Sequence, residues 1–216
     1  MIPAHLIRFD RDAPPRALIA ALVKQIAAGR PAVIPTETQY ALTADATSAR
    51  AVETVRAVKG RSASQPFSVF LSNARSLEQW RVEMPSWAQL LAETFWPGPL
   101  TLILPTHNRV FNRLGSAGSV GVRVSPEPIV QALIGAFKRP LLATSANPSG
   151  AILSVRDENN WLADGAESGK FLWVRPRRYD RKPPSTVLDC CGPKPKLVRA
   201  GAIGTAQWRE TLRKNR

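Results

Sequence analysis

Apolar positions along this chain recur with two different spacings. Between residues 15 and 30 they repeat every three or four residues, which predicts a helix with one buried face. Gly29 is where we expect that helix to end. The apolar residues of this face are Leu18, Ile19, Leu22, Val23 and Ile26.

Similar amphipathic segments and short apolar runs continue to the C-terminus. We expect helices at residues 49–59, around 74–80 and 86–95, from about 126 to 137, near 156–164, and in a basic segment at the end. We expect strands at residues 32–34, 67–71, 100–104, 120–124, 141–144, 171–174, 186–189 and 196–199. Strands that alternate with helices indicate an α/β fold with a mixed sheet.

Polar segments rich in turn-forming residues separate these elements. Residues 36–46, TETQYALTADA, follow a short strand and are typical of a hydroxyl-rich turn. The glycine-rich residues 115–121 are expected to form a loop. Residues 175–185 predict an exposed basic loop, because their charges and prolines cannot pack.

The composition is that of a globular protein. The 216 residues, 44% of them hydrophobic, fit one large domain or two small ones. No apolar run approaches the roughly 20 residues that span a bilayer, and the N-terminus does not resemble a secretory signal. Cys190 and Cys191 are neighbours and offer no disulfide framework. We therefore expect a soluble cytoplasmic protein without a membrane partner.

Positive charge is concentrated at the C-terminal end. The net charge is +14, and residues 170–216 contain thirteen basic and three acidic residues. Such asymmetry indicates a polyanionic partner, such as nucleic acid, nucleotide phosphates or a membrane surface. The other interpretation is a basic tail that serves solubility.

Several familiar catalytic arrangements are missing from the sequence. His5 and His107 lie far from cysteine or carboxylate clusters, which argues against a zinc site. There is no G-x-S-x-G motif and no Walker-type phosphate loop. The chain offers hydroxyls, amides and cations, which can position reactants and stabilise negative charge without forming a covalent intermediate.

Lys59, Gly60 and Arg61 follow the predicted helix 49–59. A lysine in the last turn and a capping glycine are ordinary features of a helix end. The functional interpretation is that the chain turns at Gly60 and directs both cations into a cleft. Two cations could hold a triphosphate there, arginine through two hydrogen bonds and lysine as a point charge.

Hydroxyl and amide residues follow two of the predicted strands. Thr144, Ser145 and Asn147 come at the end of strand 141–144, and Thr36 follows strand 32–34, with Tyr40 further along. Ligands of open α/β sheets bind beyond the carboxyl ends of strands, so these positions suit a nucleotide. Asn-Pro and Ser-Gly are also turn signals, and an ordinary loop explains the same residues.

Three further polar residues lie in or beside predicted strands. Arg123 lies within strand 120–124, where burial without a partner would be costly, so it faces solvent or an anion. Ser185 and Arg199 flank the last two strands. Taken alone, both are more typical of a basic surface.

Taken together, these segments resemble the YrdC-type threonylcarbamoyl-adenylate synthase family in its single-domain form. They occur in the family's order and cover nearly the whole chain. The matching segments are 35-PTETQYAL-42, 59-KGR-61, 96-WPGPLTLIL-104, 120-VGVRV-124, 142-LATSANPSG-150, 185-STVLD-189 and 199-RAGAI-203.

The resemblance implies a twisted open sheet with a large, basic, concave cavity. It implies an enzyme, a nucleotidyltransferase that joins L-threonine, bicarbonate and ATP into threonylcarbamoyl-AMP and releases pyrophosphate. Partner proteins would then transfer the threonylcarbamoyl group to tRNA, and tRNA or double-stranded RNA would bind the basic surface. The amine and bicarbonate supply the nucleophile as a carbamate, which agrees with a chain that lacks a nucleophile of its own.

The resemblance also assigns roles to residues. Lys59 and Arg61 would be catalytic and bind phosphates and carboxylate. The nucleotide would further contact Ser145, Asn147 and Arg199, and the threonine would contact Thr36, Tyr40, Arg123, Thr144 and Ser185. Mg²⁺ is expected with the triphosphate, although no carboxylate pair indicates a metal site in the protein. Glu37 is the nearest acid and is equally consistent with a surface position.

Some positions depart from the family's pattern. Two glycines are replaced by Ala41 and Thr43, which would cost about 1 kcal/mol or more if either position needs a positive φ. The other departures are Ser62, Gln65, Phe70 and Ala200. They leave two alternatives to a threonine-specific synthase, an RNA-binding paralogue without synthase activity and a related carbamoyl-adenylate enzyme with another acceptor.

Overall fold

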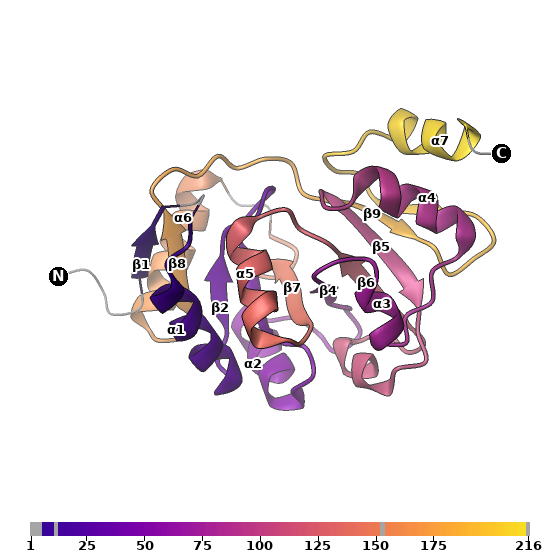
Figure 1. Cartoon of the computed structure of the whole chain (residues 1–216). Helices are drawn as coiled ribbons and strands as arrows, with labels where there is room; N and C mark the ends of the chain where they lie inside the picture. Colours follow the sequence, from indigo (N-terminus) through magenta and orange to yellow (C-terminus); the bar gives the residue numbers. More distant parts are fainter. Residues whose placement is uncertain (1–5, 11–12, 152–153, 215–216) are drawn as a thin grey trace.

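The computed structural model describes residues 6–10, 13–151 and 154–214, which form one ten-stranded mixed sheet with helices on both faces (Figure 1). The strand order is β1-β8-β2-β3-β7-β4-β6-β5-β9-β10, with both parallel and antiparallel neighbours. The strands are β1 (Leu6–Phe9), β2 (Ala32–Ile34), β3 (Ala41–Asp45), β4 (Ser68–Phe70), β5 (Leu100–Pro105), β6 (Ser119–Arg123), β7 (Leu141–Ser145), β8 (Leu172–Pro176), β9 (Thr186–Asp189) and β10 (Lys196–Arg199). No helix in this described part is long and apolar enough to cross a membrane.

The helices follow local signals in the sequence. They are α1 (Arg16–Ala27), α2 (Ala49–Lys59), α3 (Ser76–Gln79), α4 (Ser86–Phe95), α5 (Pro128–Phe137), α6 (Val155–Glu167), α7 (Thr205–Lys214) and the 3-10 helix η1 (Arg109–Leu114). Ser48 caps the start of α2 by accepting a hydrogen bond from the backbone N–H of Ala51. Gly60 ends α2 with φ of 61°, a left-handed conformation that glycine adopts without steric cost.

One face of the sheet is covered by two helices over part of its width. Helices α1 and α5 lie side by side over the strands from β8 to β7 (Figure 1). Their apolar residues, such as Leu22 and Leu133, pack against Ile34, Leu141 and Phe70 of the sheet. Over the strands beyond β4, which are β6, β5, β9 and β10, no helix of the described residues adds to this core.

The opposite face is covered along more of its length. The core on this side joins apolar residues of α2, α4, α6, α7 and η1, represented by Val55, Leu91, Leu162, Trp208 and Phe111. Successive side chains of a strand point to opposite faces of the sheet, so Leu100 and Leu102 of β5 enter this core and Thr101 points toward the other face.

Most of the expected elements are confirmed, and the α/β class with a mixed sheet is observed. The prediction for residues 36–46 was incomplete, because residues 41–45 form β3 in the middle of the sheet. Thr43 and Asp45 are polar and follow a hydroxyl-rich stretch, which is typical of a turn, yet they are buried in the sheet. Strand β1 and helix η1 were not predicted, and residues 119–121 of the expected glycine-rich loop belong to β6.

The prediction of an exposed basic loop at residues 175–185 was wrong in part. Strand β8 continues to Pro176, and the ring of Tyr179 packs on Tyr40 with centroids 4.0 Å apart. The backbone N–H of Lys182 donates to the carbonyl of Thr38 at 2.8 Å. This segment runs along the upper edge of the sheet from β8 to β9 (Figure 1), and its contacts hold it there.

Candidate functional site

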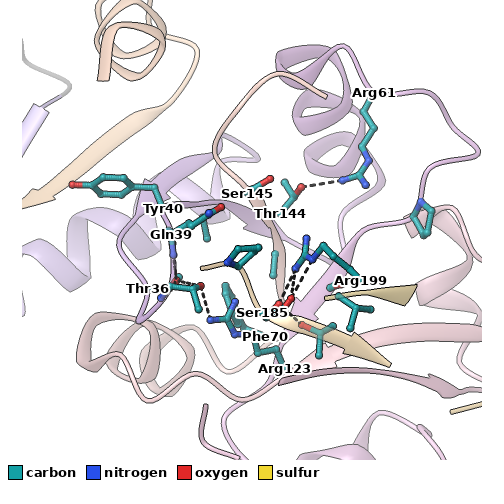
Figure 2. A pocket seen from close by; sticks show the side chains of 18 residues that line it. Thr36, Gln39, Tyr40, Arg61, Phe70, Arg123, Thr144, Ser145, Ser185 and Arg199 are labelled. Atoms are coloured by element: carbon teal, nitrogen blue, oxygen red, sulfur yellow. Dashed lines mark hydrogen bonds between the residues drawn. The ribbon is translucent and has the colours of Figure 1, made fainter. Parts of the chain in front are cut away.

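A cavity lies over the half of the sheet face that α1 and α5 leave open. Its described lining comes from strands and loops (Figure 2). The cavity has a volume of about 150 Å³, which is less than drug-sized ligands usually occupy, so a larger ligand would extend beyond its mouth. The lining residues are Thr36, Thr38, Gln39, Tyr40, Ala41, Arg61, Pro66, Ser68, Phe70, Thr101, Arg123, Ala143, Thr144, Ser145, Pro184, Ser185, Val187 and Arg199.

Small side chains on the strands create the space. Ser68, Thr101 and Ala143 face the cavity where larger residues would fill it. Gly121 supports them from the neighbouring strand, since a Cβ at this position would lie 2.5 Å from the Ser68 hydroxyl. The cavity therefore depends on residue size as well as on the lack of a covering helix.

Arg61 enters the cavity from the corner after α2, as the sequence predicted. Its Nη1 donates to the hydroxyl of Thr144 at 2.9 Å, which joins two segments 83 residues apart (Figure 2). The guanidinium also lies over the Phe67 ring, 4.7 Å from its centroid. Burial lowers the pKa of Arg61, and the nearby cations Arg56 and Arg199 add to this effect. An arginine held among cations in this way is suited to bind an anion.

The side chain of Lys59 does not point into the cavity as expected. Its Nζ donates to the carbonyls of Ser145 and Asn147 at 2.5 and 2.6 Å and to Asn147 Oδ1 at 3.2 Å. Lys59 is buried and does not line the cavity. Burial, followed by the charge of Arg61, lowers its pKa to about 7. In this structure Lys59 holds the turn after β7 instead of pointing into the cavity.

Asn147 is likewise turned away from the cavity. Its Oδ1 accepts a hydrogen bond from the Ser145 hydroxyl at 2.6 Å, and its Nδ2 donates to the carbonyl of Ala151 at 2.5 Å. Ser145 and Thr144 do line the cavity. The turn thus presents hydroxyls to the cavity and is braced from behind by Lys59 and Asn147.

Arg123 has the buried anionic partner that its position in a strand requires. Its Nη2 lies 2.6 Å from Glu37 Oε1 and 2.8 Å from the Thr38 hydroxyl. Glu37 is therefore an internal residue, and the surface position that the sequence left open for it is not observed. Thr36 accepts backbone hydrogen bonds from Thr38 and Gln39, so its hydroxyl shapes the loop that carries Glu37.

Ser185 and Arg199 also reach the cavity, although each alone was more typical of a surface. Ser185 is 3% exposed, and Arg199 donates to its carbonyl at 2.9 and 3.1 Å and to its hydroxyl at 2.9 Å. The Ser185 and Thr101 hydroxyls lie 2.9 Å apart. Partial desolvation of its guanidinium lowers the pKa of Arg199, although the residue as a whole is exposed, and the charge of Arg123 lowers it further.

Tyr40 lines the cavity at its edge, but its ring is directed away from the other labelled side chains (Figure 2). The ring packs against Trp173 and Tyr179, with centroids 6.0 and 4.0 Å away. Eight of the ten proposed site residues thus line one cavity, and Lys59 and Asn147 lie behind it.

Sequence reasoning missed several residues of the lining. Ser68 and Thr101 are polar residues in predicted strands, and that exception to an apolar pattern was an available signal. Gln39 and Pro184 gave no such signal, because only the tertiary fold brings their loops together. Ala41 and Thr43 lie in β3 without a positive φ, so the expected backbone cost of replacing glycine does not arise.

Three guanidinium groups, those of Arg61, Arg123 and Arg199, line this cavity, and Arg123 forms an ion pair with Glu37. The fold and site define an α/β protein with an arginine-lined cavity on the open half of its sheet. The chain belongs to the Sua5/YciO/YrdC family, whose model, described as telomere recombination, matches residues 24–201.

Relatives with assigned names support this membership. A threonylcarbamoyl-AMP synthase of Pyrococcus abyssi is 40% identical over 123 residues, which are 56% of this chain and 36% of that protein. A threonylcarbamoyl-AMP synthase of Marinobacter nauticus is 33% identical over 171 residues, 74% of this chain and 90% of that protein. The crystal structure of P. abyssi Sua5 complexed with L-threonine has a TM-score of 0.82 and 30% identity, covering 95% of this chain and 60% of that one. The matched region thus spans less than two thirds of the Pyrococcus protein.

Proposed function

We propose that this protein is an L-threonylcarbamoyl-adenylate synthase that converts L-threonine, bicarbonate and ATP into threonylcarbamoyl-AMP and pyrophosphate. The observation that carries the proposal is the convergence of three arginines and several hydroxyls on one cavity. Their positive charge exceeds that of the single carboxylate paired with them, so the cavity is suited to anionic ligands. Threonine, bicarbonate and ATP are all anionic or carry a carboxylate.

The proposed chemistry needs no nucleophile from the protein. The threonine amine and bicarbonate form a carbamate with loss of water, and a carbamate oxygen attacks the α-phosphorus of ATP. The bond from the α-phosphorus to the bridging oxygen breaks, and pyrophosphate leaves with that electron pair. Arg61 and Arg199 would stabilise the charge that develops on the leaving group, while the hydroxyls of Thr144 and Ser185 orient the reactants.

Mg²⁺ would accompany the triphosphate in this proposal. The described residues contain no group of three or more His, Cys, Asp or Glu side chains that could hold a metal ion. Glu37, the carboxylate nearest to the cavity, is already engaged by Arg123 and Ser125. The residues do not fit a dedicated metal site, and no step assigned here to the protein depends on one.

The relatives favour threonine as the amino acid. Their names specify threonylcarbamoyl-AMP synthases, and the P. abyssi structure is a complex with L-threonine. The threonine would lie in the enclosed part, near Thr36, Arg123, Thr144 and Ser185. The nucleotide would extend toward Arg61, Ser145 and Arg199, with Lys59 and Asn147 holding the turn beneath it.

The test is a measurement of pyrophosphate released by the full chain with ATP, L-threonine and bicarbonate present. We expect release that falls to background when any one substrate is omitted. Serine and other amino acids replace threonine in parallel reactions, because comparable rates would favour the enzyme with another acceptor. Background release with all three substrates and a folded protein would contradict the proposal.

A second proposal concerns the basic C-terminal region. We propose that residues 1–216 form one domain whose region from about residue 170 contacts tRNA or other duplex RNA in the cytoplasm, and that separate proteins transfer the threonylcarbamoyl group. All four residues of β10 are exposed, as are the basic residues Arg209, Arg213 and Lys214 of α7. Replacing Arg209 and Lys214 by alanine should reduce the slope of log binding constant against log salt by about 2. An unchanged slope would contradict RNA contact by this helix.

A further inference from the structure

Glu37 lies in a buried hydrogen-bonded network beside the cavity. Its Oε1 accepts from Arg123 Nε and Nη2 at 3.2 and 2.6 Å, and its Oε2 accepts from the Ser125 hydroxyl at 2.5 Å. The side chains of Glu37 and Arg123 are 16% and 9% exposed, and Ser125 is fully buried. Both carboxylate oxygens are therefore engaged from the side of β6.

The network extends from β6 to the loop after β2. Arg123 Nη2 also donates to the Thr38 hydroxyl at 2.8 Å, which lies 3.0 Å from the Thr36 hydroxyl. Thr36 in turn donates to the carbonyl of Gln39 at 2.6 Å. Glu37 and Arg123 thus connect two walls of the cavity that are 86 residues apart in sequence.

The geometry fixes the orientation of the guanidinium. Its Nε and Nη2 are used by Glu37 and Thr38, and Nη1 takes no part in these bonds. Arg123 lines the cavity and approaches Arg199 closely enough for the two positive charges to repel each other. A carboxylate on the outer side of Arg123 holds its plane and offsets part of that repulsion.

We propose that Glu37 is a positioning residue for the amino-acid substrate, since it orients Arg123 so that Nη1 can bind the substrate carboxylate. This inference rests on the proposed synthase function. Glu37 itself does not line the cavity and acts through Arg123. Glu37 adds negative charge near the proposed phosphate site, so it should not increase the attraction for ATP. Its expected benefit is limited to threonine, through the orientation of Arg123.

The test compares Glu37→Gln, Glu37→Asp and Ser125→Ala with the unchanged full chain. We expect Glu37→Gln to raise KM for L-threonine about tenfold, with kcat within about threefold and KM for ATP unchanged or lower. Glu37→Asp should restore part of the threonine affinity, and Ser125→Ala should raise the same KM by a smaller factor. The melting temperature of each variant and calorimetric binding of L-threonine alone are measured in parallel.

The outcomes separate this inference from the proposed function. An unchanged KM for threonine in folded Glu37→Gln, beside normal turnover by the unchanged chain, would overturn the inference alone. Equal losses for threonine and ATP that follow the melting temperature would also overturn it, because they indicate a merely structural role. If the unchanged chain binds no threonine and releases no pyrophosphate, the proposed function fails and this inference fails with it.

Discussion

The two halves of one sheet face have opposite uses. From β8 to β7 the face is covered by α1 and α5 and packed with Ile34, Leu133 and Leu141, all fully buried. Across β6, β5, β9 and β10 the same face carries small or polar residues such as Thr101 and lines the cavity, which continues onto Ser68 of β4 and Ala143 of β7 where the two halves meet. Both halves belong to the same sheet, so the side chains and the covering helices determine which half becomes core and which becomes a site.

The open half keeps its shape because loops replace the helices. The corner after α2, the loop after β2 and the turn after β7 meet at its edge, joined by bonds such as Arg61 to Thr144. Many polar groups that would be costly in the covered half are satisfied here by one another, although Arg61 Nε has no hydrogen-bond partner among the described residues. We therefore expect substitutions in the open half to change ligand binding and those in the covered half to change stability.

The largest effect is expected for Arg61→Ala. This change removes a guanidinium that faces the proposed phosphates, and we expect kcat/KM to fall about 10²–10³-fold. Stability should change little, because the residue is held among other cations. Pyrophosphate release measures the first expectation and urea unfolding measures the second.

Arg16→Ala is the matched control for Arg61→Ala. Arg16 is exposed at the start of α1, in the covered half and away from the cavity lining. Its loss lowers the net charge of the chain equally and should leave kcat/KM within about twofold. A comparable fall in both variants would show that overall charge, and not the place of Arg61, determines activity.

Leu133→Ala is the corresponding change in the covered half. Leu133 is fully buried between α5 and the sheet, and its truncation should lower the free energy of unfolding by about 3 kcal/mol. KM for threonine and ATP should remain within about twofold in the protein that stays folded. A large change in either KM at constant kcat would show that the two halves are coupled, contrary to the comparison.

Sequence pattern predicted the helices of the covered half better than its strands. The spacing of Leu18, Leu22 and Ile26 in α1 is repeated in the structure, because a helix buries one stripe whatever the rest of the chain does. Strand β3 escaped prediction because it directly follows the hydroxyl-rich residues 36–40, and its polar residues Thr43 and Asp45 are also typical of a turn. Burial in the middle of a sheet depends on neighbours that a local pattern does not contain.

The site was predictable in its parts and less so in its contacts. The motifs identified eight residues of the lining, but the direction of the Lys59 side chain depends on carbonyls 86 and 88 residues away. The pairing of Glu37 with Arg123 is equally distant in sequence. Such contacts follow from the tertiary fold, and neither composition nor spacing specifies them.

Gly201→Ala should disturb the cavity through the backbone of the loop that carries Ser185. A Cβ at Gly201 would lie 2.3 Å from the carbonyl oxygen of Pro184 and 2.5 Å from the backbone of Ser185. We expect a loss of about 2 kcal/mol in stability and a rise of severalfold in KM for threonine as Ser185 is displaced. Gly192→Ala is the control, because its added Cβ meets only one atom, at 3.9 Å. Equal results for the two variants would contradict this role of Gly201.

The smallest effect concerns Lys59, which lies at the edge of the open half but is as buried as a core residue. Its pKa is lowered to about 7 in the folded chain, below the ordinary value of 10.5, so above pH 7 the unfolded chain binds more protons at this position. The free energy of unfolding should therefore rise with pH relative to Lys59→Met, by about 1 kcal/mol between pH 7 and 8. Urea unfolding of both proteins at pH 6, 7, 8 and 9 measures the difference.

The same pH series shows whether the three oxygens around Lys59 Nζ keep the buried side chain charged. An ammonium has three N–H donors for these three acceptors, whereas a neutral amine has two. If the hydrogen bonds outweigh burial, Lys59 stays charged and the stability difference remains flat from pH 7 to 9. A flat difference would mean that the oxygens of this turn stabilise the buried ammonium of Lys59 as well as water does. The contrast between this turn and the apolar core of the covered half would then be sharper than the lowered pKa implies.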